Sequence, residues 1–304
     1  MDLTGQRVLV VGSAGAQGSG LVPAVRARGG VPVRVTSSDA RAQELRAAGD
    51  EAVVADLADS DALTAAAADT GAAAVAGIMP LAFGNPERGP LAIASYLALR
   101  SRGLPVVVNV GTPVPPPGVP DVMGGGAVSR ALADGGVAVV APTGYLENHV
   151  APWSLATLAQ GELVYPRPAG DVVAWTAATD MGTAAMAALA GDLGGQVLQL
   201  AGPQPLTFTE LVGELGAGLN RELTFRQLTP AEYGDLLRPF LGDAAAAGVE
   251  QAYAAMPPGP SPLLNPAGAG EQWQRLGAAP TAARDWAARV LRPALEGFTA
   301  QAPA

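Results

Sequence analysis

Short runs of β-branched and aliphatic residues alternate along the first half of the chain with longer stretches rich in alanine, leucine and arginine. The runs have the length of buried strands and the stretches have the length of helices. This pattern predicts a parallel sheet with helices on both faces. We expect strands at residues 7–11, 31–36, 51–54, 73–78, 105–110 and 137–141. Helices are expected in most of the gaps, including 40–48, 60–69 and 91–102.

Beyond residue 141 the alternation becomes looser. Residues 209–219 read as a helix and 222–227 as a strand, while the Pro/Gly-rich segment 256–270 predicts a long surface loop or lid. Pro23 falls inside the first expected helix, where its missing N–H predicts a kink. The patterns together predict an α/β fold, in which a doubly wound parallel sheet forms a first domain over residues 1–150. A smaller α/β substrate lobe is expected over residues 151–304, interleaved with the first domain.

The first expected strand leads directly into a glycine-rich segment, Gly12-Ser13-Ala14-Gly15-Ala16-Gln17-Gly18, and then into a helix. Glycines let the backbone approach a pyrophosphate, and free N–H groups at a helix start bind anions without a charged side chain. Such turns also close ordinary loops. The position after an apolar strand, at the beginning of a βαβ pattern, favours a dinucleotide site, so we expect residues 1–150 to be a Rossmann-type dinucleotide-binding domain.

Composition excludes several classes of function. The chain has no lysine, no cysteine and one histidine, and its formal net charge is −9. Negative charge disfavours nucleic acid as a partner. The absence of cysteine excludes disulfides and thiolate catalysis, and one histidine leaves no plausible metal-ligand set, so no metal is expected. The apolar stretch 71–83 is too short to cross a bilayer and the polar N-terminal residues do not form a signal peptide, so we expect a soluble cytoplasmic protein that does not bind membranes.

Further segments carry a family likeness when they are read with the glycine loop. These are the strand Val33-Arg34-Val35 with the following residues 36–39, the triplet Ala55-Asp56-Leu57, residues 142–148, and Asp180-Met181-Gly182 with residues 200–203. Together they resemble the NmrA-like group of atypical short-chain dehydrogenases/reductases, over nearly the whole chain to about Leu237. The resemblance implies an NAD(P)-binding Rossmann fold.

The resemblance also implies roles for individual residues in cofactor binding. Asp56 and Leu57 would border the adenine, although Asp56 also reads as a helix N-cap. The floor after the fourth strand and the wall facing the nicotinamide would be formed by Met79, Pro80, Pro142, Thr143 and Gly144.

The choice of cofactor depends on the end of the second expected strand. Folds specific for NAD place a carboxylate there for the ribose hydroxyls, whereas this chain has Thr36, Ser37 and Ser38. We therefore expect NADP, bound as NADPH. The family usually has an arginine at the position of Ser38, so Arg41 would have to reach across to supply the charge, and Asp39 opposes it.

Catalysis must proceed without the Tyr-x-x-x-Lys pair of conventional members of the superfamily, because there is no lysine to lower the pKa of a tyrosine. Tyr96 and Arg100 have the right spacing, but they lie before the fifth strand and fit an amphipathic helix face. Thr112, His149 and Tyr145 remain as candidates to stabilise or protonate a substrate oxygen. Each also has a purely structural interpretation: Thr112 as a turn residue, His149 as an ordinary surface or helix-end residue, and Tyr145 as an aromatic ring packed beneath the cofactor.

The sequence thus predicts an NADPH-dependent reductase of a ketone, quinone or enone in a bulky hydrophobic or polycyclic molecule, such as a ketoreductase of specialised metabolism. Trp153, Tyr253 and Trp273 are possible aromatic contacts, or simply core residues. A phenol within the substrate could itself share a proton with the nascent alkoxide. The alternative is an NADP(H)-sensing regulatory protein without turnover, since the missing lysine fits both. A sugar-nucleotide epimerase depends on the tyrosine–lysine pair and is disfavoured.

Overall fold

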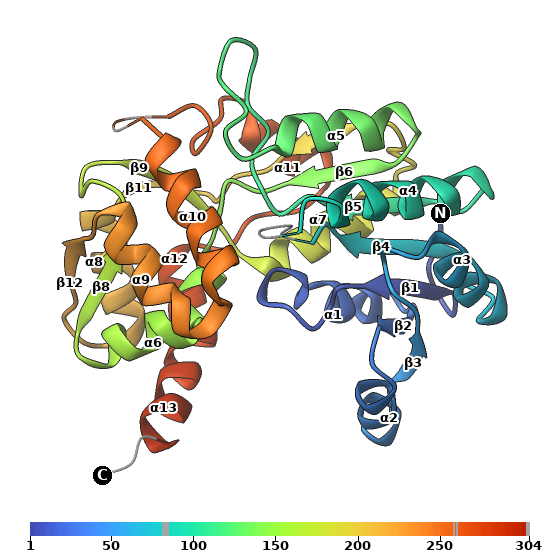
Figure 1. Cartoon of the computed structure of the whole chain (residues 1–304), viewed down its shortest axis with the longest axis horizontal. Coiled ribbons are helices and arrows are strands. Elements are labelled where there is room, and N and C mark those ends of the chain that lie inside the picture. Colours follow the sequence, from blue (N-terminus) through green and yellow to red (C-terminus); the bar gives the residue numbers. More distant parts are fainter. Residues whose placement is uncertain (81–84, 258, 260, 302–304) are drawn as a thin grey trace.

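The computed structural model describes residues 1–80, 85–257, 259 and 261–301. Figure 1 shows a large sheet with its helices beside a smaller part that carries most of the C-terminal elements. The elements up to the last strand of the large sheet are β1 (Arg7–Val11), a 3-10 turn η1 (Ala16–Gly18), α1 (Leu21–Ala27), β2 (Val31–Thr36), α2 (Asp39–Ala47), β3 (Glu51–Val54), α3 (Ser60–Asp69), β4 (Ala74–Ile78), α4 (Arg88–Ser101), β5 (Val106–Asn109), α5 (Gly125–Asp134), β6 (Ala138–Ala141), β7 (Gly144–Tyr145), a 3-10 turn η2 (Leu146–Val150), α6 (Pro152–Ala159), β8 (Glu162–Tyr165), β9 (Val172–Thr176), α7 (Ala178–Ala190) and β10 (Val197–Gln199).

The large sheet has seven parallel strands in the order β10-β6-β5-β4-β1-β2-β3. The chain therefore leaves this sheet after β6, contributes β7, β8 and β9 elsewhere, and returns through α7 to add β10 beside β6. The strand order reverses between β1 and β4. Ligands bind at such a reversal, outside the carboxyl ends of the strands, in open sheets of this kind.

Both faces of the large sheet are buried, as the near-continuous apolar strands predict, and successive side chains of a strand point to opposite faces. On β1, Val8 and Val10 pack on one face in a cluster with residues of α1 and α7. Leu9 and Val11 pack on the other face with residues of α3, α4 and α5. The carboxyl end of the sheet is consequently held rigidly between two helical layers.

The smaller part has its own core of aromatic and aliphatic residues, which includes Trp175, Phe208 and Trp286. Its small sheets have the orders β11-β9-β7 and β12-β8. The remaining elements are β11 (Pro205–Thr207), α8 (Phe208–Leu219), β12 (Thr224–Gln227), α9 (Pro230–Leu241), α10 (Asp243–Ala255), α11 (Ala269–Arg275), α12 (Ala283–Trp286), a π-turn η3 (Ala287–Leu291) and α13 (Arg292–Gln301).

The expected doubly wound sheet is confirmed, with strand limits that agree to within a residue. The kink expected at Pro23 is wrong, because α1 begins only at Leu21 and Pro23 lies in its first turn. The described residues between 256 and 268 form a loop and α11 begins at Ala269, but Leu263 and Leu264 are buried and the N–H of Ala174 donates to the carbonyl of Leu264 at 2.9 Å. Residues 258 and 260 of that segment, and 81–83 of the apolar stretch, lie outside the described residues. In the described part of the chain, no helix is long and apolar enough to cross a membrane.

Candidate cofactor and substrate site

A cavity of about 530 Å³ begins at the carboxyl ends of β1, β4, β5 and β6 and extends into the smaller part. It brings together many of the residues singled out from the sequence. Those lining it are Gly12, Gly15, Ala16, Gln17, Gly18, Met79, Pro80, Thr112, Thr143, Gly144 and Tyr145. Glu147 and Asn148 line it as well.

The glycine loop folds tightly before α1. Gly18 and Ser19 donate their N–H groups to the carbonyls of Gly15 and Ala16. A Cβ on Gly18 would lie 2.1 Å from the carbonyl oxygen of Gly12, so this glycine allows the loop to close on itself. A Cβ on Gly15 would have only that carbonyl oxygen as a neighbour, at 3.9 Å. Gly15 thus leaves open space in the cavity wall, as a backbone cradle for a pyrophosphate requires.

Ser13 and Ala14 belong to the same loop but are not part of the cavity lining. Ser13 is buried, and its hydroxyl accepts a hydrogen bond from Nε of Arg34 at 3.3 Å. Arg34 is also paired with Asp50 at 2.7 Å, and Asp50 is paired in addition with Arg26. The two guanidinium groups hold the pKa of Asp50 below its ordinary value, with the hydrogen bond from Arg34 as the main cause. Two arginines share one carboxylate here, which leaves a net positive charge beside the loop.

The end of β2 lies apart from the cavity. Thr36 ends the strand, its hydroxyl accepts a hydrogen bond from the N–H of Ser38 at 3.3 Å, and Ser37 is exposed. Ser38 caps α2 by accepting from the N–H of Arg41. The Arg41 side chain does not reach back to Ser38, because it pairs with Glu44 on the surface of α2 at 2.7 Å.

Asp56 does not cap a helix; the N-cap of α3 is Asp59. The carboxylate of Asp56 accepts from the N–H of Ala58 at 2.9 Å and pairs with Arg88 at 3.0 Å. Leu57 is partly buried against the core. Both residues are outside the cavity lining, at the carboxyl end of β3.

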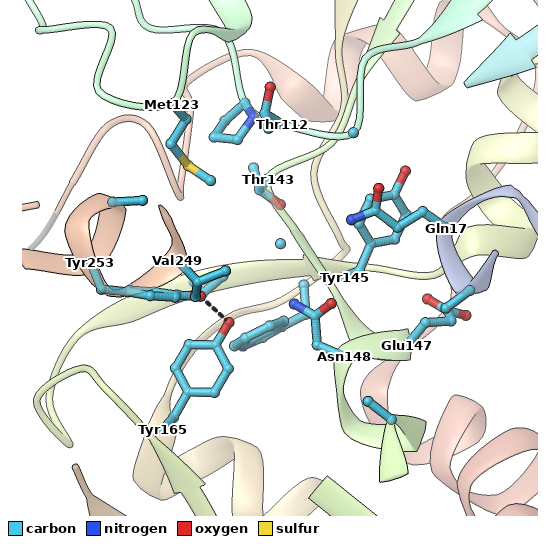
Figure 2. Close-up of a pocket in the computed structure, with 18 of the residues that line it drawn as sticks. Gln17, Thr112, Met123, Thr143, Tyr145, Glu147, Asn148, Tyr165, Val249 and Tyr253 are labelled. Atoms are coloured by element: carbon cyan, nitrogen blue, oxygen red, sulfur yellow. Dashed lines mark hydrogen bonds between the residues drawn. The ribbon is translucent and has the colours of Figure 1, made fainter. Parts of the chain in front are cut away.

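Tyr145 lies where the glycine loop and the rest of the cavity meet, with the side chain of Gln17 beside it (Figure 2). Its hydroxyl oxygen accepts a hydrogen bond of 2.6 Å from the amide nitrogen of Asn109. The amide oxygen of Asn109 accepts from the N–H of Gly111 at 3.0 Å, which orients the amide. Burial raises the pKa of Tyr145, so the phenol keeps its proton at neutral pH. Thr112 lines the same region with its hydroxyl near Gly125 of α5.

The wall expected to face a nicotinamide is fixed by bonds to the backbone. The hydroxyl of Thr143 donates to the carbonyl of Ala174 and lies 3.2 Å from the hydroxyl of Thr176. The Pro142 carbonyl, outside the cavity lining, accepts from the side-chain amide of Gln199 at 3.3 Å. The hydroxyl of Thr143 is therefore occupied. Gly144 lines the cavity, and a Cβ there would lie 3.2 Å from the side chains of Trp175 and Val173.

His149 is not placed for acid–base chemistry. It is 0% exposed, is absent from the cavity lining, and packs against Trp175 with ring centroids 4.9 Å apart. Neither ring nitrogen has a hydrogen-bond partner among the described residues. Burial lowers its pKa from 6.5 to about 3, so the ring is neutral and part of the core.

Glu147 is a buried carboxyl group that reaches the cavity wall. Its oxygens accept hydrogen bonds from the N–H of Ala178, at the start of α7, and from the indole of Trp286, each at 2.9 Å. Burial raises its pKa from 4.5 to about 7, against the lowering effect of both donors. Glu147 joins η2, α7 and α12, which is a structural role.

Aromatic side chains line the half of the cavity away from the glycine loop, and we call this half the aromatic chamber. Its rings belong to Trp153, Tyr165, Trp175, Phe208, Tyr233 and Tyr253. The expectation that Trp153 and Tyr253 contribute to a pocket agrees with this placement. Trp273 is elsewhere, buried with its indole N–H donating to the carbonyl of Ala201 at 2.7 Å.

Two polar residues near the cavity, Asn109 and Arg34, could have been singled out from the sequence. Asn109 is a polar residue ending the apolar run VVVN, and Arg34 is a charge within the apolar run VPVRVT. A polar group in a buried strand usually has a specific partner. Arg167, which also lines the aromatic chamber, pairs with the nearby Asp171, but the carbonyls of Met256 and Pro257 that it also bonds come from a distant segment.

Comparison with known proteins was made by sequence and by structure. No protein-family model matches the chain, and no curated protein sequence matches it either. The NADPH-dependent quinone oxidoreductase of Escherichia coli, crystallised with NADPH, has a TM-score of 0.62 and 20% identity, over 93% of this chain and 99% of that chain. A nucleoside-diphosphate-sugar epimerase from Staphylococcus aureus has a TM-score of 0.70 and 16% identity, over 93% and 100%. A double mutant of NmrA has a TM-score of 0.67 and 17% identity, over 97% and 98%.

Proteins of different activity thus share this architecture, and identities of 20% or less establish the fold alone. The chain has the Rossmann-type α/β fold of these structures over nearly its whole length.

Proposed function

We propose that the protein is an NADPH-dependent reductase of a ketone, quinone or enone within a bulky aromatic molecule. The observation that carries this proposal is the single cavity of about 530 Å³ that joins the glycine loop to the aromatic chamber. Ligand sites have volumes of this order and are mostly apolar with a few placed polar groups. A dinucleotide alone would not require a chamber of aromatic rings.

Several features support NADPH as the cofactor. The glycine loop has open backbone surface at Gly15, where a pyrophosphate would lie, and Gly144 lines the facing wall. Arg34 beside Ser13 supplies the positive charge that Arg41 does not, and the positions of Thr36, Ser37 and Ser38 carry no carboxylate. The structurally similar quinone oxidoreductase binds NADPH. When bound, a reduced nicotinamide supplies a hydride, that is two electrons and one proton, to an electrophilic carbon of the substrate.

We assign the supply of the second proton to Tyr145, which lines the cavity. Addition of a hydride to a carbonyl carbon leaves an alkoxide, and the neutral phenol donates its proton to that oxygen. Because Asn109 donates to the phenol oxygen, the O–H of Tyr145 is free to point elsewhere, and the amide stabilises the phenolate left behind. A proton taken up from the solvent then restores the phenol, so the net reaction consumes one proton from solution. Asn109 thereby takes over part of the role that lysine has in a tyrosine–lysine pair.

The test is the loss of NADPH absorbance with a panel of quinones and polycyclic aromatic ketones. Turnover is expected with at least one of them, and Tyr145→Phe is expected to lower kcat by about 10²-fold or more while NADPH binding is unchanged. The matched control is Tyr96→Phe. Tyr96 is a buried tyrosine outside the cavity lining whose hydroxyl donates to the carbonyl of Ile78, so kcat should stay within about threefold.

An NADP(H)-sensing regulator remains the competing function, and the same experiment distinguishes it. Binding of NADPH without turnover of any compound in the panel would overturn the reductase and favour the sensor. Unchanged kcat in Tyr145→Phe, with turnover intact, would instead remove Tyr145 as the proton donor and favour proton donation by the substrate's own phenol.

A further inference from the structure

The aromatic chamber contains a pair of tyrosine hydroxyls, which lies apart from Tyr145 in Figure 2. Tyr165, the last residue of β8, and Tyr253, on α10, place their hydroxyl oxygens 2.6 Å apart (Figure 2). Their rings meet edge to face with centroids 5.6 Å apart. Trp175 and Phe208 pack against the ring of Tyr165, at 5.6 and 5.1 Å. The aromatic packing therefore fixes where this pair of hydroxyls lies.

This pair has hydrogen-bonding capacity left for a ligand. Each hydroxyl has one proton and two lone pairs, and the bond between them uses one proton and one lone pair. Whichever tyrosine donates, the other retains its proton. Burial raises the pKa of both phenols, so both are neutral at physiological pH. The pair can thus donate one hydrogen bond to a ligand and accept others, in a chamber whose other rings are apolar or aromatic and whose charged lining residue is Arg167.

The charge beside the pair is balanced. Arg167 lines the same chamber and is buried with Asp171, and their charged groups lie 2.5 Å apart. The Arg167 guanidinium also donates to the carbonyls of Met256 and Pro257, at 3.2 and 2.8 Å. An anionic ligand would lose its hydration here without meeting an unpaired cation, which is costly. A neutral oxygen that accepts or donates a hydrogen bond avoids that cost.

On the basis of the function proposed above, we infer that the Tyr165–Tyr253 hydroxyl pair binds a neutral oxygen of the substrate remote from the carbonyl that is reduced. The substrate class is then a fused-ring aromatic ketone or quinone that carries a phenolic hydroxyl or a second carbonyl group. Apolar rings without such an oxygen would leave the remaining hydroxyl proton of the pair without an acceptor, which is unfavourable in a buried site.

The experiment measures equilibrium binding of two fused-ring ketones that have a single carbonyl and differ by one remote hydroxyl, 1-tetralone and 6-hydroxy-1-tetralone, to the full-length protein without cofactor. The wild-type protein is expected to bind the hydroxylated probe about threefold to tenfold more tightly, the range of one net hydrogen bond. Tyr165→Phe and Tyr253→Phe should each remove most of this preference.

Tyr233→Phe is the matched control, because it removes a hydroxyl from a ring in the same chamber that is not part of the pair. It should change the affinity for both probes by the same factor and so preserve the preference. Circular dichroism and thermal unfolding confirm that each variant is folded, and either variant of the pair suffices if the other does not fold.

Equal wild-type affinities for the two probes, or equal loss of both in the variants of the pair, would overturn the inference. Because the experiment measures binding rather than turnover, failure of this inference can be distinguished from failure of the proposed function. A preference that depends on the pair, in a protein that oxidises no NADPH, would retain the oxygen site and remove the reductase. Turnover of NADPH without any preference for the hydroxylated probe would retain the reductase and remove the oxygen site.

Discussion

Two glycines in the loop after β1 differ in what a side chain would meet. A Cβ on Gly18 would lie against the carbonyl oxygen of Gly12, whereas a Cβ on Gly15 would enter open space in the cavity wall. Gly15→Val should therefore weaken NADPH binding by about tenfold or more while leaving the unfolding temperature nearly unchanged. Gly18→Ala should lower the free energy of unfolding by about 1–3 kcal/mol, as overpacking does. Fluorescence titration with NADPH and thermal unfolding measure the two effects. Unchanged NADPH affinity in a folded Gly15→Val protein would argue against a pyrophosphate at this loop.

Two buried titratable groups near the cavity respond to pH in opposite directions. His149 has a pKa of about 3 in the folded chain, against 6.5, so the unfolded chain binds its proton first as pH falls. Its contribution to stability is present above pH 6.5 and declines as pH drops towards 3. Glu147 has a pKa of about 7, against 4.5, so the folded chain binds its proton more tightly. Its contribution is present below pH 4.5 and declines as pH rises through 7. Between pH 4.5 and 6.5 the two groups change the free energy of unfolding with pH in opposite directions, so their pH dependences cancel.

Replacing either Glu147 or His149 should reveal the pH dependence of stability that the other residue contributes. Relative to the wild-type protein, Glu147→Gln should become more stable as pH rises from 4.5 to 6.5, and His149→Leu should become less stable over the same interval. The difference in slope is at most about 1.4 kcal/mol per pH unit, the value for one proton. Urea unfolding at several pH values measures it. Parallel stability curves for the three proteins would show that neither group has the shifted pKa that its burial causes.

Pro23 illustrates how an element boundary changes the meaning of a residue. Gly20 is the N-cap of α1, and the first helical bond runs from the N–H of Ala24 to the carbonyl of Gly20, so Pro23 breaks no backbone bond. Pro23→Ala should lower the free energy of unfolding by about 0.4–1 kcal/mol, because the unfolded chain gains freedom. A proline within the helix interior predicts the opposite sign, with a gain of up to about 3 kcal/mol. The sign of the change in a denaturant titration distinguishes the two positions.

Strands with continuous apolar runs were predictable from the sequence, since a strand such as residues 7–11 is buried on both faces and needs no partner information. The strand β10 was not expected. It has only three residues, Val197–Gln199, and its strand character comes from pairing with β6 rather than from its own pattern. The start of α1 was also missed, because Gly18, Ser19 and Gly20 extend the loop before the helix begins.

The glycine loop and Tyr145 were predictable as parts of a site because local sequence marks them. Asn109, Arg34 and the Tyr165–Tyr253 pair depend on contacts between distant elements, such as the bond from Asn109 on β5 to Tyr145 on β7. His149 follows directly after residues near the cavity, yet η2 turns its ring into the core against Trp175. Proximity along the chain did not determine which side chains face the cavity.

The molecule as a whole combines a negative formal charge of −9 with a local excess of positive charge beside the glycine loop. Arg26 and Arg34 share the carboxylate of Asp50, and Arg34 also reaches Ser13. A 2′-phosphate carries charge that NADH lacks, so this local excess favours NADPH. The strongly negative remainder of the surface makes that local charge matter more, because it repels anions that lack a specific partner.

A ligand that binds only the folded chain stabilises the whole molecule in proportion to its occupancy. At a concentration about 100 times its Kd, NADPH should raise the free energy of unfolding by about 2.7 kcal/mol, which corresponds to a rise of several degrees in Tm. NADH at the same concentration should raise Tm by clearly less. Arg34→Met should narrow the gap between the cofactors, whereas Arg41→Met, which breaks only the surface pair with Glu44, should preserve it. Each Tm shift is measured against the same variant without cofactor, so the stability lost with the Arg34–Asp50 ion pair does not affect the comparison. A larger shift with NADH than with NADPH in the wild-type protein would reverse the choice of cofactor and remove the role given to Arg34.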